Sequence, residues 1–383
     1  MGFALLTLFP GRVGGSESNV RGLLAQFAQG NGPATVTVLA NRHVMDAYRD
    51  FEHGPVELHE VRSYRPGNRM PTRALAMAGA RVAPALAARD APADIDVMHY
   101  PVTVPIPATP APRVTTVYDV QHHDLPAYFS PFERAYRRWA YDGAARSADV
   151  VVTTSEWSKQ RLVHVLGIEP QRVEVALMGV DRRRFSPEPR PEDVHVRSAH
   201  GLPEHFLVYP ANLWPHKNHG RLLEALAAAR DRKVGLVLTG RSYGRLDRLL
   251  ARASELGVRG RVRHLGFVAN DTVPALYRLA EGMIFPSLYE GFGSPPVEAM
   301  ACGCPVAASG RGSLAEVCDG AALELEPESV ESIAAAIDAL CGDHELRERL
   351  ADAGIRRARE LSWETCALRH RSIYARVAAT RGQ

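Results

Sequence analysis

The stretch that decides the fold of this chain runs from Phe285 to Glu316 and reads FPSLYEGFGSPPVEAMACGCPVAASGRGSLAE. The apolar run at residues 282–287 predicts a strand. The glycines that follow predict a loop in which bare backbone N–H groups approach a ligand closely. The proline pair at 295 and 296 favours the first turn of a helix. Strand, loop and helix N-terminus together form a binding site that suits a diphosphate.

Two carboxylates border this loop, with seven residues between them. Glu290 is expected in the loop, and Glu298 is expected in the first turn of the helix. We expect one carboxylate to accept hydrogen bonds from sugar hydroxyls and the other to accept them from a ribose. Neither carboxylate has to act as a nucleophile in this interpretation.

The whole block resembles the donor-site motif of retaining glycosyltransferases with the GT-B fold, the family usually numbered 4. The resemblance rests on the E-x7-E spacing, on EGFG at residues 290–293, on the helix that follows and on GCPVAAS at residues 303–309. It implies an α/β fold with two Rossmann-like domains whose parallel sheets face a cleft, and a C-terminal helix that returns to the first domain. It further implies metal-independent transfer of a sugar, with retention of configuration, from a UDP- or GDP-sugar to an acceptor hydroxyl.

Strands alternate with helices along both halves of the 383 residues, which predicts parallel crossover units in two domains of similar size. We expect an N-terminal acceptor-side domain over residues 1–190 and a donor domain over residues 191–365. Residues 366–383 are the expected returning helix. Residues 182–200 are rich in proline and charge, and they are the expected linker.

The charge and the cysteine content of the chain indicate which kinds of partner and which cellular compartment to expect. The chain has 46 basic and 43 acidic residues, a balance that does not indicate a nucleic-acid partner. Its five cysteines lack zinc-site spacing, so we expect reduced thiols in a cytoplasmic protein. The apolar N-terminus is expected to be a core strand and not a signal peptide. Two interpretations are open for Arg182–Arg184 and the arginines of the last helices. They contact a membrane surface peripherally, or they form a face exposed to solvent.

The donor loops are expected to supply the cation for the leaving group. Lys217 follows the predicted strand at residues 206–210, and it is one of three lysines against 43 arginines. The resemblance implies an Arg and a Lys five residues apart here, both directed at the diphosphate. Lys217 matches the lysine, but Asn212 stands at the arginine position, and Arg241 is the candidate that compensates. The resemblance places Phe267 at the nucleobase, with a plain core role as the alternative. Gly291, Phe292 and Gly293 complete the predicted donor site.

The acceptor side is predicted from two segments that follow strands of the first half. Gly14 and Gly15 are expected beside the donor phosphate, and Ser16 is expected near the acceptor while also capping a helix. Tyr118 stands where the family has a histidine near the anomeric centre. Asp119 is expected to orient the acceptor hydroxyl.

Two adjacent histidines follow within the same segment. His122 is expected to reach the catalytic centre, and His123 is expected to contact the acceptor. A metal site formed by His122, His123 and Asp124 is the weaker alternative, so no metal or other cofactor is expected beyond the nucleotide sugar.

Three function classes fit these features. The first is the glycosyltransferase. The second is a nucleotide-sugar epimerase or a phosphorylase on the same fold, because fold alone does not decide function. An epimerase would act on the donor without an acceptor. The third class is a non-catalytic sugar-nucleotide-binding partner subunit. This class is considered because Asn212 and Tyr118 depart from the residues that the resemblance implies at their positions.

Overall fold

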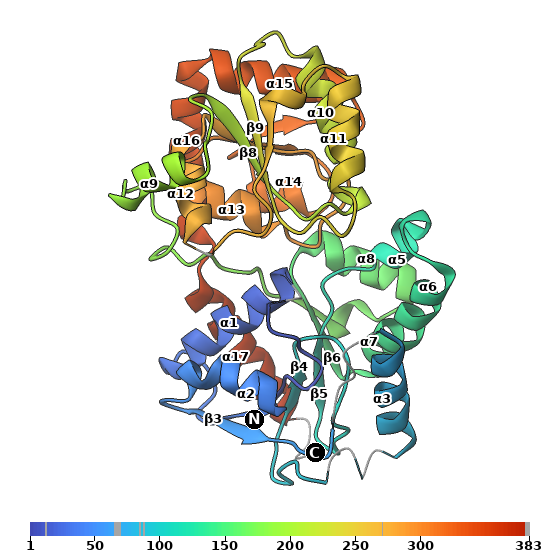
Figure 1. Cartoon of the computed structure of the whole chain (residues 1–383). Helices are drawn as coiled ribbons and strands as arrows, with labels where there is room; N and C mark the ends of the chain where they lie inside the picture. Colours follow the sequence, from blue (N-terminus) through green and yellow to red (C-terminus); the bar gives the residue numbers. More distant parts are fainter. Residues whose placement is uncertain (12–13, 65–69, 84–85, 87–88, 270, 380–383) are drawn as a thin grey trace. The chain divides into compact units, whose positions relative to one another are not determined.

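The computed structural model describes residues 1–11, 14–64, 70–83, 86, 89–269 and 271–379. The chain forms two units, shown in Figure 1: unit 1 comprises Met1–Gly179 with Trp363–Gln383, and unit 2 comprises Val180–Ser362. The chain changes unit after Gly179 and after Ser362, where the sequence suggested changes after residues 190 and 365. The two crossing points are joined in a parallel bridge between Val180 and Ser362.

Unit 1 is built on a seven-stranded sheet in the order β3-β2-β1-β4-β5-β6-β7, in which neighbouring strands are parallel. Phe3 of the central strand pairs with Val38, and both side chains are fully buried. This burial follows from helices covering both faces of a parallel sheet. The strands are β1 (Gly2–Ala4), β2 (Val36–Ala40), β3 (Val56–Glu60), β4 (Met98–Tyr100), β5 (Arg113–Thr116), β6 (Val150–Thr153) and β7 (Val173–Val175).

The helices of unit 1 include the last helix of the chain, α17, which packs against α1, as the resemblance implied (Figure 1). The rings of Phe27 and Tyr374 meet edge to face at 6.3 Å, and the ring of Trp363 fills the space beside Gly22. The helices are α1 (Gly15–Ala28), α2 (Arg42–Tyr48), α3 (Met70–Val82), α5 (Gln121–Asp124), α6 (Pro131–Arg137), α7 (Gly143–Ser147), α8 (Glu156–Leu166) and α17 (Trp363–Ala379).

The helical segment at residues 131–148 is not one continuous α-helix. A π-helical turn, η3 (Arg138–Asp142), separates α6 from α7. Such a turn holds one extra residue, so it changes the direction in which the following side chains point. The apolar periodicity of this segment did not reveal the insertion.

Unit 2 contains a six-stranded parallel sheet in the order β10-β9-β8-β11-β12-β13. Phe206, Val237 and Ile284 are fully buried in it. The strands are β8 (Phe206–Pro210), β9 (Gly235–Thr239), β10 (Val262–His264), β11 (Gly282–Phe285), β12 (Val306–Ser309) and β13 (Leu323–Leu325). The helices are α9 (Glu192–Ala199), α10 (His219–Ala228), α11 (Leu246–Glu255), α12 (Thr272–Leu279), α13 (Ser294–Ala301), α14 (Ser313–Cys318), α15 (Val330–Gly342) and α16 (His344–Glu360).

The proline-rich segment at residues 182–200 is not a plain linker. It contains α9, which lies beside α12 (Figure 1). Arg278 of α12 donates through two nitrogens to the carboxylate of Asp193, at 2.7 and 2.6 Å. The proline and charge of this segment gave no sign of the buried ion pair that joins it to the rest of unit 2.

Within the described ranges, no helix combines the length and the apolar character that a membrane crossing needs.

Candidate functional site

Lys217 and Glu290 meet at the carboxyl-terminal edge of the unit 2 sheet. Lys217 ends a 3-10 turn that follows β8, and Glu290 follows β11, the strand beside β8. Lys217 Nζ donates to Glu290 Oε1, and their side chains are 15% and 12% exposed. The Nζ atom also lies 5.4 Å from the centre of the Phe285 ring. In open α/β sheets this edge is where ligands bind.

The two loops that carry this pair are joined by hydrogen bonds. The Tyr209 hydroxyl donates to the backbone oxygen of Lys217 at 2.7 Å, and the Leu288 N–H donates to the oxygen of His216 at 2.8 Å. Asn218 Nδ2 donates to the oxygen of Pro286 at 3.1 Å. These contacts fix the position of the lysine before any ligand arrives. Sequence reasoning missed these supporting residues, because nothing local links them to residue 290.

Gly293 is the hinge between the donor loop and α13. Its φ of 92° lies in the left-handed region, and a Cβ there would lie 2.4 Å from Leu314 Cδ2. Ser313 Oγ donates to the backbone oxygens of Glu290 at 2.8 Å and of Phe292 at 3.3 Å. Gly291 lies between these two anchored residues. The Ser313 hydroxyl therefore holds the loop through its backbone oxygens. At Gly293 the backbone conformation would be strained with any other residue.

Glu298 lies in the second turn of α13, so its predicted place in the first turn was wrong. The helix begins at Ser294, one residue before the proline pair, and has no acidic residue in its first turn. The Tyr277 hydroxyl donates to Glu298 Oε2 at 3.4 Å. Burial raises the pKa of the Glu298 carboxyl, and the opposing effects of Arg184 and Tyr277 do not cancel that rise.

Asn212 and Arg241 form one assembly. Asn212 Oδ1 accepts a hydrogen bond from the Arg241 N–H at 2.8 Å, so the residue at the expected arginine position holds the neighbouring loop. The Arg241 guanidinium lies 4.6 Å from the ring centre of Phe267, which is 65% exposed. The exposure of Phe267 argues against the alternative core role. All three residues follow strand ends of the same sheet edge.

Unit 1 holds a cavity of about 170 Å³. Its wall includes Thr7 after β1, Val102 after β4, and Tyr118 and Asp119 after β5. Ser16, in the first turn of α1, also lines it. Three predicted acceptor-side residues therefore meet in one hollow at strand ends. Aromatic and basic lining residues from other elements were missed by sequence reasoning, namely Phe9, Tyr64, Tyr136, Arg137 and Tyr141.

Tyr118 and the glycine loop have defined local partners. The Tyr118 hydroxyl donates to the oxygen of Pro101 at 2.9 Å and accepts from Asn19 Nδ2 at 3.0 Å. Burial raises the pKa of Tyr118 above its ordinary value, so this hydroxyl stays protonated. Gly14 precedes α1 with a φ of 60°, and Gly15 begins the helix. Residues 12 and 13 of this loop lie outside the described residues.

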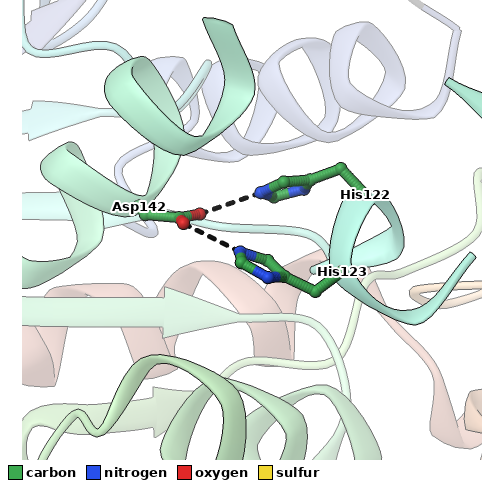
Figure 2. A group of neighbouring side chains, drawn as sticks. All are labelled: His122, His123 and Asp142. Atoms are coloured by element: carbon green, nitrogen blue, oxygen red, sulfur yellow. Dashed lines mark hydrogen bonds and ion pairs between the residues drawn. The ribbon is translucent and has the colours of Figure 1, made fainter. Parts of the chain in front are cut away.

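His122 and His123 both contact Asp142, as Figure 2 shows. Their Nε2 atoms lie 2.9 and 2.8 Å from the two carboxylate oxygens. Burial acts to raise the pKa of Asp142, but the hydrogen bonds from the two histidines hold it below its usual value. Neither histidine is among the described residues that line the cavity. Asp124, the carboxylate in the weaker metal alternative, instead pairs with Arg161.

Comparisons with known proteins identify the family and support the two-unit α/β fold. Residues 192–357 match the family described as glycosyl transferases group 1, and residues 13–184 match Glycosyltransferase Family 4. The O-antigen chain mannosyltransferase B of Escherichia coli is 30% identical over 266 residues, which are 68% of this chain and 69% of that protein. The MMP alpha-(1->4)-mannosyltransferase of Mycolicibacterium hassiacum is 32% identical over 246 residues, which are 61% of this chain and 57% of that protein, less than two thirds of its length.

A solved structure extends the similarity to the whole fold. Anabaena HepE in complex with UDP-glucose superimposes with a TM-score of 0.72 at 21% identity, and the match covers 100% of this chain and 98% of that chain. Two parallel α/β sheets joined in this way are the architecture of GT-B proteins. The chain therefore belongs to the glycosyltransferases, in the family of group 1 and family 4 enzymes.

Proposed function

We propose that this enzyme transfers a hexose from a nucleotide diphosphate sugar to an acceptor hydroxyl with retention of configuration, and that the transfer step needs no metal. The observation that carries the proposal is the Lys217–Glu290 pair at the sheet edge, beside the glycine loop that opens α13. Two relatives are named mannosyltransferases, and the HepE structure is named as a complex with UDP-glucose. Mannose and glucose are therefore the first sugars to test.

The leaving diphosphate is placed against Lys217 and the backbone N–H groups of residues 291–293. A lysine has three N–H donors, so Lys217 is able to bind Glu290 and a phosphate oxygen together. The N-terminus of α13 adds partial positive charge. These groups are preorganised where negative charge develops, which is the arrangement that stabilises a transition state.

Glu290 is assigned to the sugar hydroxyls and Glu298 to the ribose, while Phe267 presents an exposed ring to the base. In the bond-making step, the bond from the anomeric carbon to the phosphate oxygen breaks and the acceptor oxygen bonds to the same face. The acceptor proton goes to the departing phosphate oxygen. No enzymic nucleophile is required.

The acceptor hydroxyl is placed in the unit 1 cavity, near Asp119 and Tyr118. A carboxylate accepts a hydrogen bond from a hydroxyl and so orients its oxygen. The rings of Phe9, Tyr64 and Tyr136 offer apolar faces to the rest of the acceptor. A cytoplasmic site of action is part of the proposal, because all five cysteines are free thiols.

Calorimetric titration with UDP, GDP and dTDP, without metal and then with magnesium, is the first test. Binding of one nucleotide with equal affinity in both conditions would support the donor site and name the base. The anomeric configuration of the product, measured by NMR, tests retention. A product of inverted configuration would overturn the proposed same-face attack.

The non-catalytic partner subunit remains a second candidate because Asn212 supplies no positive charge. The substitution Asn212→Arg separates the two cases. Tighter diphosphate binding by this variant is expected if the diphosphate site around Lys217 is intact and lacks only one positive charge. Nucleotide binding by the wild-type protein without detectable sugar transfer would favour the non-catalytic partner subunit.

A further inference from the structure

A cluster of metal-ligating side chains lies outside the proposed donor loops. Two imidazoles from α5 and one carboxylate from the π-helical turn η3 point toward one another (Figure 2). One ligand atom from each of His122, His123 and Asp142 falls within 4.8 Å of the others. The side chains are 1%, 19% and 3% exposed, so the cluster is largely shielded from solvent.

The π-helical turn places the carboxylate. Residues 138–142 form this turn between two α-helical segments, and Asp142 is its last residue. In an uninterrupted helix, one residue fewer would rotate Asp142 by roughly 100° around the axis. Single π-helical turns occur frequently at functional sites. The distortion therefore serves to direct a carboxylate onto two imidazoles that lie about twenty positions earlier in the chain.

The chemistry of the three groups matches a defined class of ligand. Two imidazole nitrogens and one carboxylate oxygen are a ligand set for zinc and related first-row divalent ions. The two carboxylate oxygens of Asp142 already face the two imidazole Nε2 atoms, at 2.9 and 2.8 Å, so the three groups converge on one point. The exposed fraction of His123 leaves a route from solvent.

We propose that His122, His123 and Asp142 bind a first-row divalent transition metal, of the zinc class, which ties α5 to the π-helical turn. Three protein ligands leave a fourth position for water. This metal has a positioning role. The cluster lies in unit 1, whereas the residues proposed to bind the diphosphate lie in unit 2, so the transfer step is still written without a metal.

The residues just before α5 and residues in and beside the π-helical turn line the unit 1 cavity. Tyr118 and Asp119 precede α5, while Arg137 and Tyr141 come from α6 and the π-helical turn, and all four line the cavity. The rings of His122 and Tyr141 also meet edge to face at 6.5 Å. Metal binding would therefore hold two parts of the proposed acceptor wall together.

The competing interpretation is that the two histidines only hydrogen-bond to Asp142 and that no metal binds. The distances of 2.9 and 2.8 Å between the Nε2 atoms and the carboxylate oxygens are those of hydrogen bonds. His122 Nδ1 is buried without a hydrogen-bond partner. That nitrogen lacks a partner whether Nε2 carries a proton or a metal, so it favours neither state. The two interpretations differ in whether the chain binds a metal in fixed proportion.

The test uses the full chain, freed of metal with a chelator and then titrated with Zn²⁺ and separately with Co²⁺. We expect one equivalent of either ion to bind and Co²⁺ to develop the visible absorption of a low-coordinate site. The variants His123→Gln and Asp142→Asn are expected to bind the metal at least about tenfold more weakly. Removal of a residue that only hydrogen-bonds to a metal ligand already costs about tenfold or more, and removal of a ligand should cost no less. The control His205→Gln breaks a histidine–carboxylate pair of 2.8 Å elsewhere and should bind like the wild type.

Thermal unfolding supplies a second measurement. Zn²⁺ should raise the unfolding midpoint of the wild type and of His205→Gln, because a ligand that binds the folded state stabilises it. At the same Zn²⁺ concentration it should raise the midpoint of His123→Gln much less, because this variant binds the ion more weakly. The side chain of His123 is partly exposed, so this variant best tolerates substitution. Less than one equivalent bound by the wild type, or equal binding by His123→Gln, would overturn the proposal. Neither result depends on the proposed sugar transfer.

Discussion

Lys217 is the residue on which the proposed donor site depends most. The substitution Lys217→Ala removes the cation that stabilises the leaving diphosphate, and Glu290 then loses its partner. Loss of one such group lowers kcat by about 10²- to 10³-fold in comparable sites. Steady-state kinetics should show this fall together with weaker nucleotide diphosphate binding. Lys159→Ala, on α8 of unit 1, is the control and should keep both. Unchanged kinetics for Lys217→Ala would remove the lysine from the mechanism.

Gly293 makes a separate prediction about stability. An alanine there adds left-handed strain of about 1–2 kcal/mol and a contact with Leu314 at 2.4 Å. Gly320 also has a positive φ, of 73°, but nothing lies within 4 Å of its added Cβ. Gly293→Ala should therefore lower the free energy of unfolding by about 1–3 kcal/mol more than Gly320→Ala, as overpacking does. Denaturant unfolding of both variants measures the difference, and equal losses would mean that Leu314 moves aside freely.

The contact between α9 and α12 carries the prediction at the scale of elements. Asp193 and Arg278 are 8% and 5% exposed and form a two-point ion pair. Asp193→Ala leaves a buried guanidinium without its partner, which costs about 3–5 kcal/mol. The matched control is Arg252→Ala at the half-exposed pair with Glu224, where a loss under about 1 kcal/mol is expected. Denaturant unfolding should rank the two variants in this order. Similar losses would show that α9 adds little to unit 2.

At the scale of the whole molecule, buried neutral histidines in both units should make the protein sensitive to acid. Burial lowers the pKa of His219 in unit 2 to about 3 and the pKa of His370 in unit 1 to about 4. It also lowers the pKa of His99, whose ring lies 5.7 Å from that of His370. The unfolded chain, with histidines near pKa 6.5, takes up protons that the folded chain does not. Stability is therefore full above pH 6.5 and falls as the pH drops from 6.5 toward 4.

The expected slope is about 1.4 kcal/mol per pH unit for each such histidine. Denaturant unfolding at a series of pH values measures it. His370→Gln should reduce the slope, whereas substitution of the exposed His164 should leave it unchanged. A free energy of unfolding that stays constant between pH 6.5 and 4 would contradict the buried neutral state.

The sequence by itself determined the class of fold and predicted the edge of each sheet at which the proposed site residues lie. Apolar runs of strand length and the glycines and prolines of residues 282–296 are local signals, and β8 has the predicted bounds. Local signals also located Lys217, Glu290 and Asp119 in loops that follow strands. They placed the proline pair in the first turn of α13 correctly, but they misplaced Glu298 by one turn and did not show the π-helical turn.

Only the tertiary structure decided which of these residues meet. Lys217 and Glu290 are 73 positions apart, and the pairing order β8-β11 brings them together. His122 and Asp142 meet because of a one-residue helix insertion, and Asn212 holds the Arg241 loop across 29 positions. Such contacts depend on strand order and helix packing. The apolar pattern of a single sequence shows which residues are buried, but it does not show which residues they meet. The pattern of residues therefore specifies elements, and the packing of those elements specifies the partners of each side chain.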